Sequence, residues 1–140
     1  MEIANIRPRL TSFRVTSFHG ENKASSNGQE PWSIQLTQTT TVGLASGNES
    51  QDQLLGIVTI ELLAKASKNA APDQVAEFRG VYEAKFGYPD NVSEAQISPL
   101  FDTEPYQYAL TSQVFPLAMT HFRREMQSTG FDARNLPLGL

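Results

Sequence analysis

The chain has 140 residues, of which 39% are hydrophobic and 19% charged, and this composition predicts a single soluble globular domain over residues 1–140. Its net charge of −4 gives little electrostatic support to nucleic-acid binding, which needs a basic surface. The absence of cysteine excludes disulfides, thiolate catalysis and cysteine-based zinc sites, and no apolar run is long enough to span a membrane.

The first two predicted strands are residues 10–19 and 32–42, and a polar loop rich in glycine, serine and asparagine separates them. In the second strand the apolar residues Ile34, Leu36 and Val42 alternate with serine, glutamine and threonine. Such alternation is typical of a strand with one buried face. The four threonines of this segment also favour a strand over a helix.

The third and fourth predicted strands are residues 54–65 and 75–88. The third is apolar on both faces, which predicts either burial on both sides or half-burial in a contact between subunits. The fourth alternates clearly, with an apolar row opposite a charged one. Gly80 lies in that apolar row, where a glycine suggests a bulge or a close approach of the backbone.

A long amphipathic helix follows a connector at residues 91–103, which is expected to hold a short helical turn. Asp102 or Thr103 can cap its start, Pro105 is tolerated in its first turn, and Gly130 is suited to its end. Pro116 lies inside the helix and predicts a kink. Apolar residues at helical spacing form one stripe, namely Tyr106, Leu110, Val114, Leu117, Phe122 and Met126.

This order of four strands, a connector and a long helix resembles the SecB family of export chaperones. Tyr106, the helical Val-Phe-Pro-Leu-Ala segment at 114–118, the Gly130-Phe131 stop and the Asn-Leu-Pro-Leu tail at 135–138 carry the resemblance. It implies an α+β fold, in which one long kinked helix follows a four-stranded antiparallel sheet. It also implies dimers formed by sheets joined edge to edge, and tetramers formed through the long helices.

The function that the resemblance implies is that of a holdase, a chaperone that binds unfolded polypeptides without ATP. Such a protein is cytoplasmic, needs no cofactor and is not an enzyme. The sequence ends at Leu140, where typical members add a second helix and a tail that docks on the SecA motor, so engagement of SecA is in doubt. The alternative is a dedicated chaperone of one client, such as an antitoxin or a phage protein.

The candidate client-binding residues are the apolar and aromatic residues of the second and fourth strands, namely Trp32, Ile34, Leu36, Phe78, Tyr82 and Phe86. The aromatic row of the fourth strand can equally form the sheet core or a subunit interface. The candidate oligomer interface is the helix stripe, with Tyr106, Leu110, Val114, Leu117 and Phe122.

Catalytic and metal sites find no support in the pattern. No nucleotide-binding glycine motif is present, and no serine lies in a nucleophile elbow. His19 and His121 lie far apart and without companion ligands, so no metal is expected. A small α+β enzyme or ligand-binding protein would instead need a pocket with converging polar groups.

Overall fold

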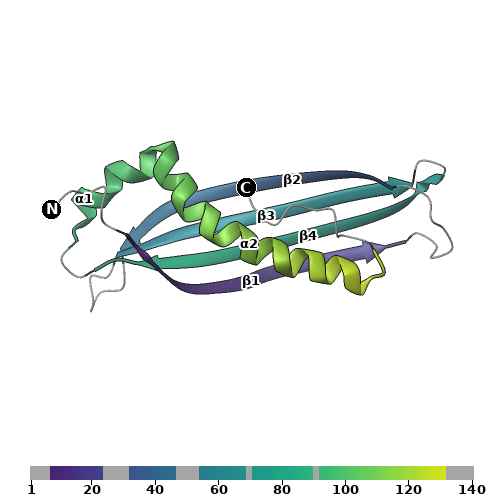
Figure 1. The fold of residues 1–140 in the computed structure, drawn as a ribbon, viewed down its shortest axis with the longest axis horizontal. Coiled ribbons are helices and arrows are strands. Elements are labelled where there is room, and N and C mark those ends of the chain that lie inside the picture. The colour runs from purple at the N-terminus through teal and green to yellow at the C-terminus, as the bar shows by residue number, and fades with distance from the viewer. Residues whose placement is uncertain (1–6, 24–31, 47–53, 69–70, 90–91, 132–140) are drawn as a thin grey trace.

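The computed structural model describes residues 7–23, 32–46, 54–68, 71–89 and 92–131. The side chain of Trp32 and the tail at 135–138 lie outside this description. The four strands are β1 (Arg9–Asn22), β2 (Trp32–Ser46), β3 (Leu54–Lys68) and β4 (Ala71–Gly87). They form one antiparallel sheet in the order β1-β4-β3-β2 (Figure 1). The predicted α+β class and four-stranded antiparallel sheet are confirmed.

Each strand extends beyond at least one of its predicted ends. The second strand was predicted to end at residue 42, but Ala45 pairs with Leu55 and Ser46 with Leu54. Backbone pairing with an apolar neighbour therefore overrides the weak strand preference of these small residues.

One face of the sheet is buried beneath a single layer of helix. Every second residue of β3 and β4 points to this face, and the rows include Val58, Ile60, Leu62, Phe78, Tyr82 and Phe86, all buried. The opposite row of β3, with Leu55, Ile57 and Leu63, is only half-buried. Within one chain, β3 is thus buried on one side, and its second apolar row lies on the open face of the sheet.

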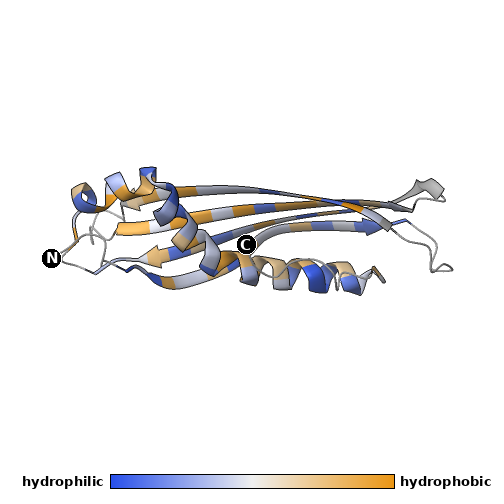
Figure 2. Cartoon of the chain, turned by 45° about the horizontal axis from the view of Figure 1, so that its top comes forward, coloured by the Kyte–Doolittle hydropathy of each residue, from blue (hydrophilic) through white to orange (hydrophobic). Residues whose placement is uncertain are grey.

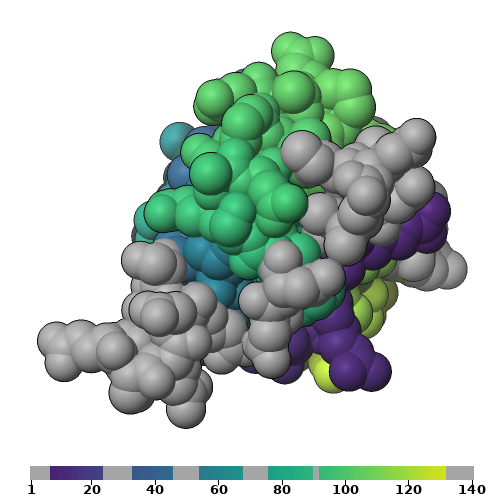
Figure 3. Space-filling view, turned by 90° about the vertical axis from the view of Figure 1, so that its left-hand side faces the viewer, coloured from purple at the N-terminus to yellow at the C-terminus, as the bar shows by residue number. Residues whose placement is uncertain are grey.

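Three helical segments follow the sheet: α1 (Glu94–Ile97), the 3₁₀-helix η2 (Ser98–Asp102) and α2 (Glu104–Ser128). Ser93 and Gln96 form a capping box at the start of α1. The short helical turn predicted in the connector is therefore present. Figure 3 shows the green atoms of these segments over one end of the sheet, beside the blue and teal atoms of β2 and β3.

The long helix α2 crosses the sheet diagonally, from β2 to β1, and contacts all four strands (Figure 1). It continues through Pro116, and its axis changes direction along its length (Figure 2). It ends at Ser128, and Gly130, the predicted stop, follows the C-cap Thr129 with a φ of 87°. The amides of Gly130 and Phe131 donate to the carbonyls of Gln127 and Met126, which is a Schellman motif.

Gly80 permits a close side-chain approach and does not mark a bulge. The register shifts of β4 with β1 instead lie in β1, next to Thr11 and Thr16, whose hydroxyls donate to carbonyls of β4. The ring of Tyr82 lies over Gly80 on the same face, and the Tyr82 hydroxyl is 3.0 Å from His121 Nδ1 on α2. A glycine at this position leaves room for the ring that links the sheet to the helix.

We predict that Gly80→Ala destabilises the protein by about 2 kcal/mol, because overpacking a core costs roughly 1–3 kcal/mol. The added Cβ would lie 2.5 Å from the Tyr82 oxygen. Gly43→Ala is the matched control in β2, where a Cβ meets no atom within 4 Å. Urea unfolding measures both. Equal stability of the two variants would contradict the close approach.

Buried phenols predict a loss of stability at alkaline pH. Burial raises the pKa of Tyr82 and of Tyr88 above the ordinary value of 10.0. The folded state therefore favours the neutral phenols, and their contribution is complete below pH 10 and is lost as the pH rises above it. Tyr82→Phe and Tyr88→Phe together should flatten the fall in unfolding free energy above pH 10. Urea unfolding at a series of pH values measures the fall, and an unchanged fall in the double variant would contradict the burial of these phenols.

Candidate functional site

A cleft of about 470 Å³ lies between the edge strand β2 and the first half of α2. It exists because α2 crosses the sheet diagonally, so that its first turns meet the sheet beside β2 (Figure 1). The lining residues come from both elements: Gln38, Thr40, Val42, Glu104, Gln107, Tyr108 and Thr111. Thr40 pairs with Ile60 and Val42 with Val58, so the β2 residues of the cleft share the face that α2 covers.

Tyr108 is the main exposed aromatic group of the cleft, with 57% of its surface accessible. Next to it, the side-chain amide of Gln107 donates to the Phe101 carbonyl at 2.6 Å, which ties the first turn of α2 to η2. Thr111 is buried and Val42 is half-buried. The lining therefore combines apolar surface with hydroxyl and amide groups, and Glu104 is the charged residue among them.

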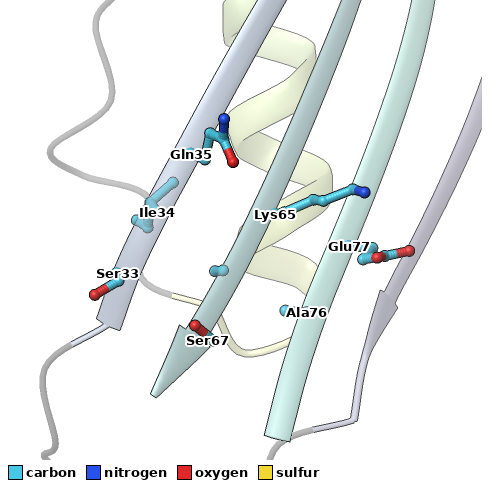
Figure 4. Close-up of a pocket in the computed structure, with 8 residues that line it drawn as sticks. Ser33, Ile34, Gln35, Lys65, Ser67, Ala76 and Glu77 are labelled. Atoms are coloured by element: carbon cyan, nitrogen blue, oxygen red, sulfur yellow. The ribbon is translucent and has the colours of Figure 1, made fainter. Parts of the chain in front are cut away.

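A second hollow of about 360 Å³ lies at the end of β2, β3 and β4 where β2 begins (Figure 4). Its side chains include Gln35, Lys65 and Glu77, which lie on the face turned away from α2 (Figure 4). The same face carries the cross-strand ion pairs Arg14–Glu83 and Arg79–Glu61. This hollow has two charged side chains in its lining, Lys65 and Glu77, whereas Glu104 is the charged residue of the cleft beside α2. The cleft beside α2 is therefore the better suited of the two to an apolar polypeptide.

In the part of the chain that the structure describes, no group of three or more histidine, aspartate or glutamate side chains could hold a metal ion. His121 instead packs against Phe18 and Tyr82 and lies 3.5 Å from Glu125. Its contacts join α2 to β1 and β4.

The aromatic residues predicted to bind a client do not reach the surface of the single chain. Phe78, Tyr82 and Phe86 are buried beneath the layer over the sheet, with Phe13 stacked on Tyr82. Their burial supports the alternative reading of this row as sheet core. Ile34 differs, because 38% of its surface is exposed.

The remaining β2 residues of the prediction are placed unequally. Leu36 is half-buried and packs against the edge of the core. Trp32 is the first residue of β2, and its side chain lies outside the described residues. Among the predicted client-binding residues, the described surface therefore offers Ile34 and part of Leu36.

The helix stripe packs chiefly on its own sheet. Leu110, Val114 and Phe122 are buried within the chain, and the half-buried Tyr106 shares a hydroxyl hydrogen bond with Tyr88. Leu117 does not belong to this stripe, and 40% of its surface is exposed. Ala118 and Met119 occupy the next buried positions after Val114 and Phe115, so Leu117 turns outward.

The sequence reading missed the cleft itself, and Tyr108 carried the signal that could have found it. Tyr108 follows Tyr106 by two residues, which places it off the apolar stripe of an α-helix. An aromatic residue off that stripe is expected to be exposed, and tyrosine is enriched among the residues that contribute most to binding. The contribution of Gln38 and Thr40 depends on where α2 crosses the sheet, which the local pattern does not specify.

Comparison with known proteins supports the fold. No protein-family model and no curated protein matches the chain. A solved structure with a similar fold is the SecB-like chaperone Rv1957 of Mycobacterium tuberculosis, determined in complex with a ChAD peptide from the Rv1956 HigA1 antitoxin. The TM-score is 0.59 at 14% identity, over 96% of this chain and 88% of that chain. The SecB-like fold implied by the sequence resemblance is thus confirmed.

Proposed function

We propose that this chain is a chaperone that binds non-native polypeptides without ATP, in the cleft between β2 and α2. The observation that carries the proposal is an open, partly apolar cleft beside an edge strand on a SecB-like sheet. The fold neighbour was determined with a peptide of an antitoxin, so this architecture can hold a peptide.

The chemistry of the cleft suits binding with low sequence selectivity. Tyr108 offers a rigid aromatic surface, and aromatic residues of this kind are enriched among the strongest contributors to binding. Val42 adds aliphatic surface, while Gln38 and Thr40 can exchange hydrogen bonds with a polypeptide backbone. Since the contacts combine general apolar surface with backbone-compatible polar groups, many extended segments can satisfy them.

The second candidate function is a chaperone dedicated to one client, such as an antitoxin or a phage protein. The antitoxin peptide bound to the fold neighbour favours it. A dedicated chaperone binds its own client and fails on unrelated unfolded chains. An assay with several unrelated unfolded proteins therefore separates the two candidates, because equal binding of all of them supports the general chaperone.

For assembly, we propose a cytoplasmic homo-oligomer, a dimer or a tetramer, in which the outer side of α2 contacts another subunit. Leu117 supports this contact, because it is an apolar side chain exposed at the middle of the helix. Tyr106, at the start of α2, is half-buried, so part of its side chain is also accessible to another subunit. Docking on SecA remains a prediction from the family resemblance. No helix among the described residues is long and apolar enough to cross a membrane.

We predict that Tyr108→Ser weakens the binding of a reduced, carboxymethylated unfolded protein at least about tenfold, because truncation of a central aromatic contact costs roughly 2 kcal/mol or more. Val15→Ser is the matched control, because Val15 is also an exposed apolar residue but lies on β1. Fluorescence anisotropy of the labelled client measures both affinities without nucleotide. Equal affinities for the two variants would place the binding site elsewhere.

We predict that Leu117→Asp lowers the mass of the oligomer in light scattering and leaves the melting temperature within a few degrees of the parent chain. A charge at an apolar contact between subunits disrupts association, whereas Leu117 is not part of the core. Gln113→Asp, at an exposed polar residue of the same helix, should leave the mass unchanged. An unchanged mass for Leu117→Asp would exclude this part of α2 from the interface.

A further inference from the structure

The first turns of α2 carry two tyrosines that lie on nearly opposite sides of the helix. Successive residues of an α-helix are rotated by about 100°, so residues two positions apart differ by about 200°. Tyr106 is half-buried and packs against the core, whereas Tyr108 lines the cleft with 57% of its surface accessible. The contacts that hold Tyr106 on the sheet side therefore also fix where Tyr108 stands.

A hydrogen bond between two phenols holds this side of the helix. The Tyr106 hydroxyl shares it with the hydroxyl of Tyr88, which follows the end of β4 and is buried. Burial raises the pKa of both phenols above the ordinary value of 10.0, so both keep their hydrogens at neutral pH and either can donate. In the sheet order, β3 separates β4 from β2. The bond thus ties the first turn of α2 to the end of an inner strand, and not to the edge strand across the cleft.

The backbone of β3 leaves room for this contact at Gly56. A Cβ added at Gly56 would lie 3.5 Å from the Tyr88 oxygen and 3.3 Å from the ring of Phe101 in η2. The Phe101 ring also packs on the ring of Tyr106, with 5.3 Å between their centroids. Three aromatic side chains, from η2, from α2 and from the residue after β4, therefore meet in one cluster over the sheet.

The same turn of α2 carries the polar part of the cleft lining, with Glu104 and Gln107 next to Tyr108. The side-chain amide of Gln107 donates to the Phe101 carbonyl at 2.6 Å, so this cleft residue is also bound to a member of the aromatic cluster. A displacement of Tyr106 would therefore move the aromatic and polar groups of the helical wall of the cleft together.

We propose that Tyr88 and Tyr106 are positioning residues of the cleft. Their hydrogen bond holds the first turn of α2, and with it Tyr108, at the distance from β2 at which the client is bound. This inference rests on the proposed function and identifies what sets the geometry of its site. Tyr88 is buried and acts without touching the client. Loss of the bond frees the turn, and binding must then restore its order at a cost in affinity.

Two substitutions that remove the same hydrogen bond test the inference. Tyr88→Phe and Tyr106→Phe keep the rings and each delete one hydroxyl. Each should weaken the binding of the labelled, carboxymethylated unfolded protein about fivefold, which corresponds to the loss of one hydrogen bond. The double variant should bind no more weakly than the weaker single variant, because both substitutions remove one shared interaction. Fluorescence anisotropy measures the affinities at a temperature at which urea unfolding shows every variant to be folded.

Tyr82→Phe is the matched control, because it deletes a buried hydroxyl that links the sheet to His121 in the second half of α2. It should lower the urea midpoint, because it removes a hydrogen bond of the fold. It should leave the affinity for the unfolded protein within about twofold, because distant sites act independently. A role of the first two hydroxyls in stability alone would instead leave the affinity of all three variants unchanged.

Amide hydrogen exchange of the free protein gives a second readout that needs no client. Tyr106→Phe should speed the exchange of residues 108–111 and leave that of residues 118–126 unchanged, because the lost bond frees the first turns of α2. Equal exchange in this variant and in the parent chain would overturn the inference, because the hydrogen bond would then not hold the turn.

Client affinities that the two substitutions leave unchanged would also overturn the inference. The proposed function would still stand, because the parent chain binds the unfolded protein. Losses that add in the double variant would show that the two hydroxyls act separately, and would contradict a shared bond. If the parent chain does not bind the unfolded protein, the proposed function fails and the inference fails with it.

Discussion

The packing of one diagonal helix on one face of a four-stranded sheet is the constraint on which the rest of the structure depends. Val114, Phe115 and Phe122 of α2 are buried, as are the aromatic residues Phe78 and Tyr82 of β4. Burial of such side chains contributes about 2 kcal/mol each, which is the main favourable term for a domain of this size. Because a single helix forms the layer, the cover over the four strands is uneven.

Because α2 covers the strands unevenly, it leaves the cleft in which we propose that the client binds. The first half of α2 stands beside β2 and leaves a cleft there, while its second half passes over β1, where Phe18 contacts Phe122 and His121. The two edge strands therefore differ in structure. β1 has two register shifts in its pairing with β4, whereas β2 pairs regularly with β3 and lies next to an exposed aromatic residue. Binding without a nucleotide needs no more than such a surface.

The sequence predicted the elements well because alternation is a local property. Alternation predicted the four strands and the apolar row with Phe78, Tyr82 and Phe86. The end of the helix was predicted from the glycine at position 130. What covers each apolar row could not be predicted, because a pattern indicates that a face is buried but not against which element. For that reason the aromatic row of the fourth strand was assigned to client binding, and the helix stripe was assigned to contacts between subunits. Leu117 was expected in the stripe that α2 buries but is exposed, because which side of α2 meets the sheet depends on the path of the helix.

Amide hydrogen exchange tests the central claim most directly, by comparing the free protein with its complex with an unfolded client. The account predicts slower exchange in residues 38–42 of β2 and residues 104–111 of α2, because a bound polypeptide shields these amides or stabilises their segments. Exchange in β1 should remain unchanged. Protection confined to β1 or to the open face of the sheet, or no protection at all, would contradict the assignment of client binding to this cleft.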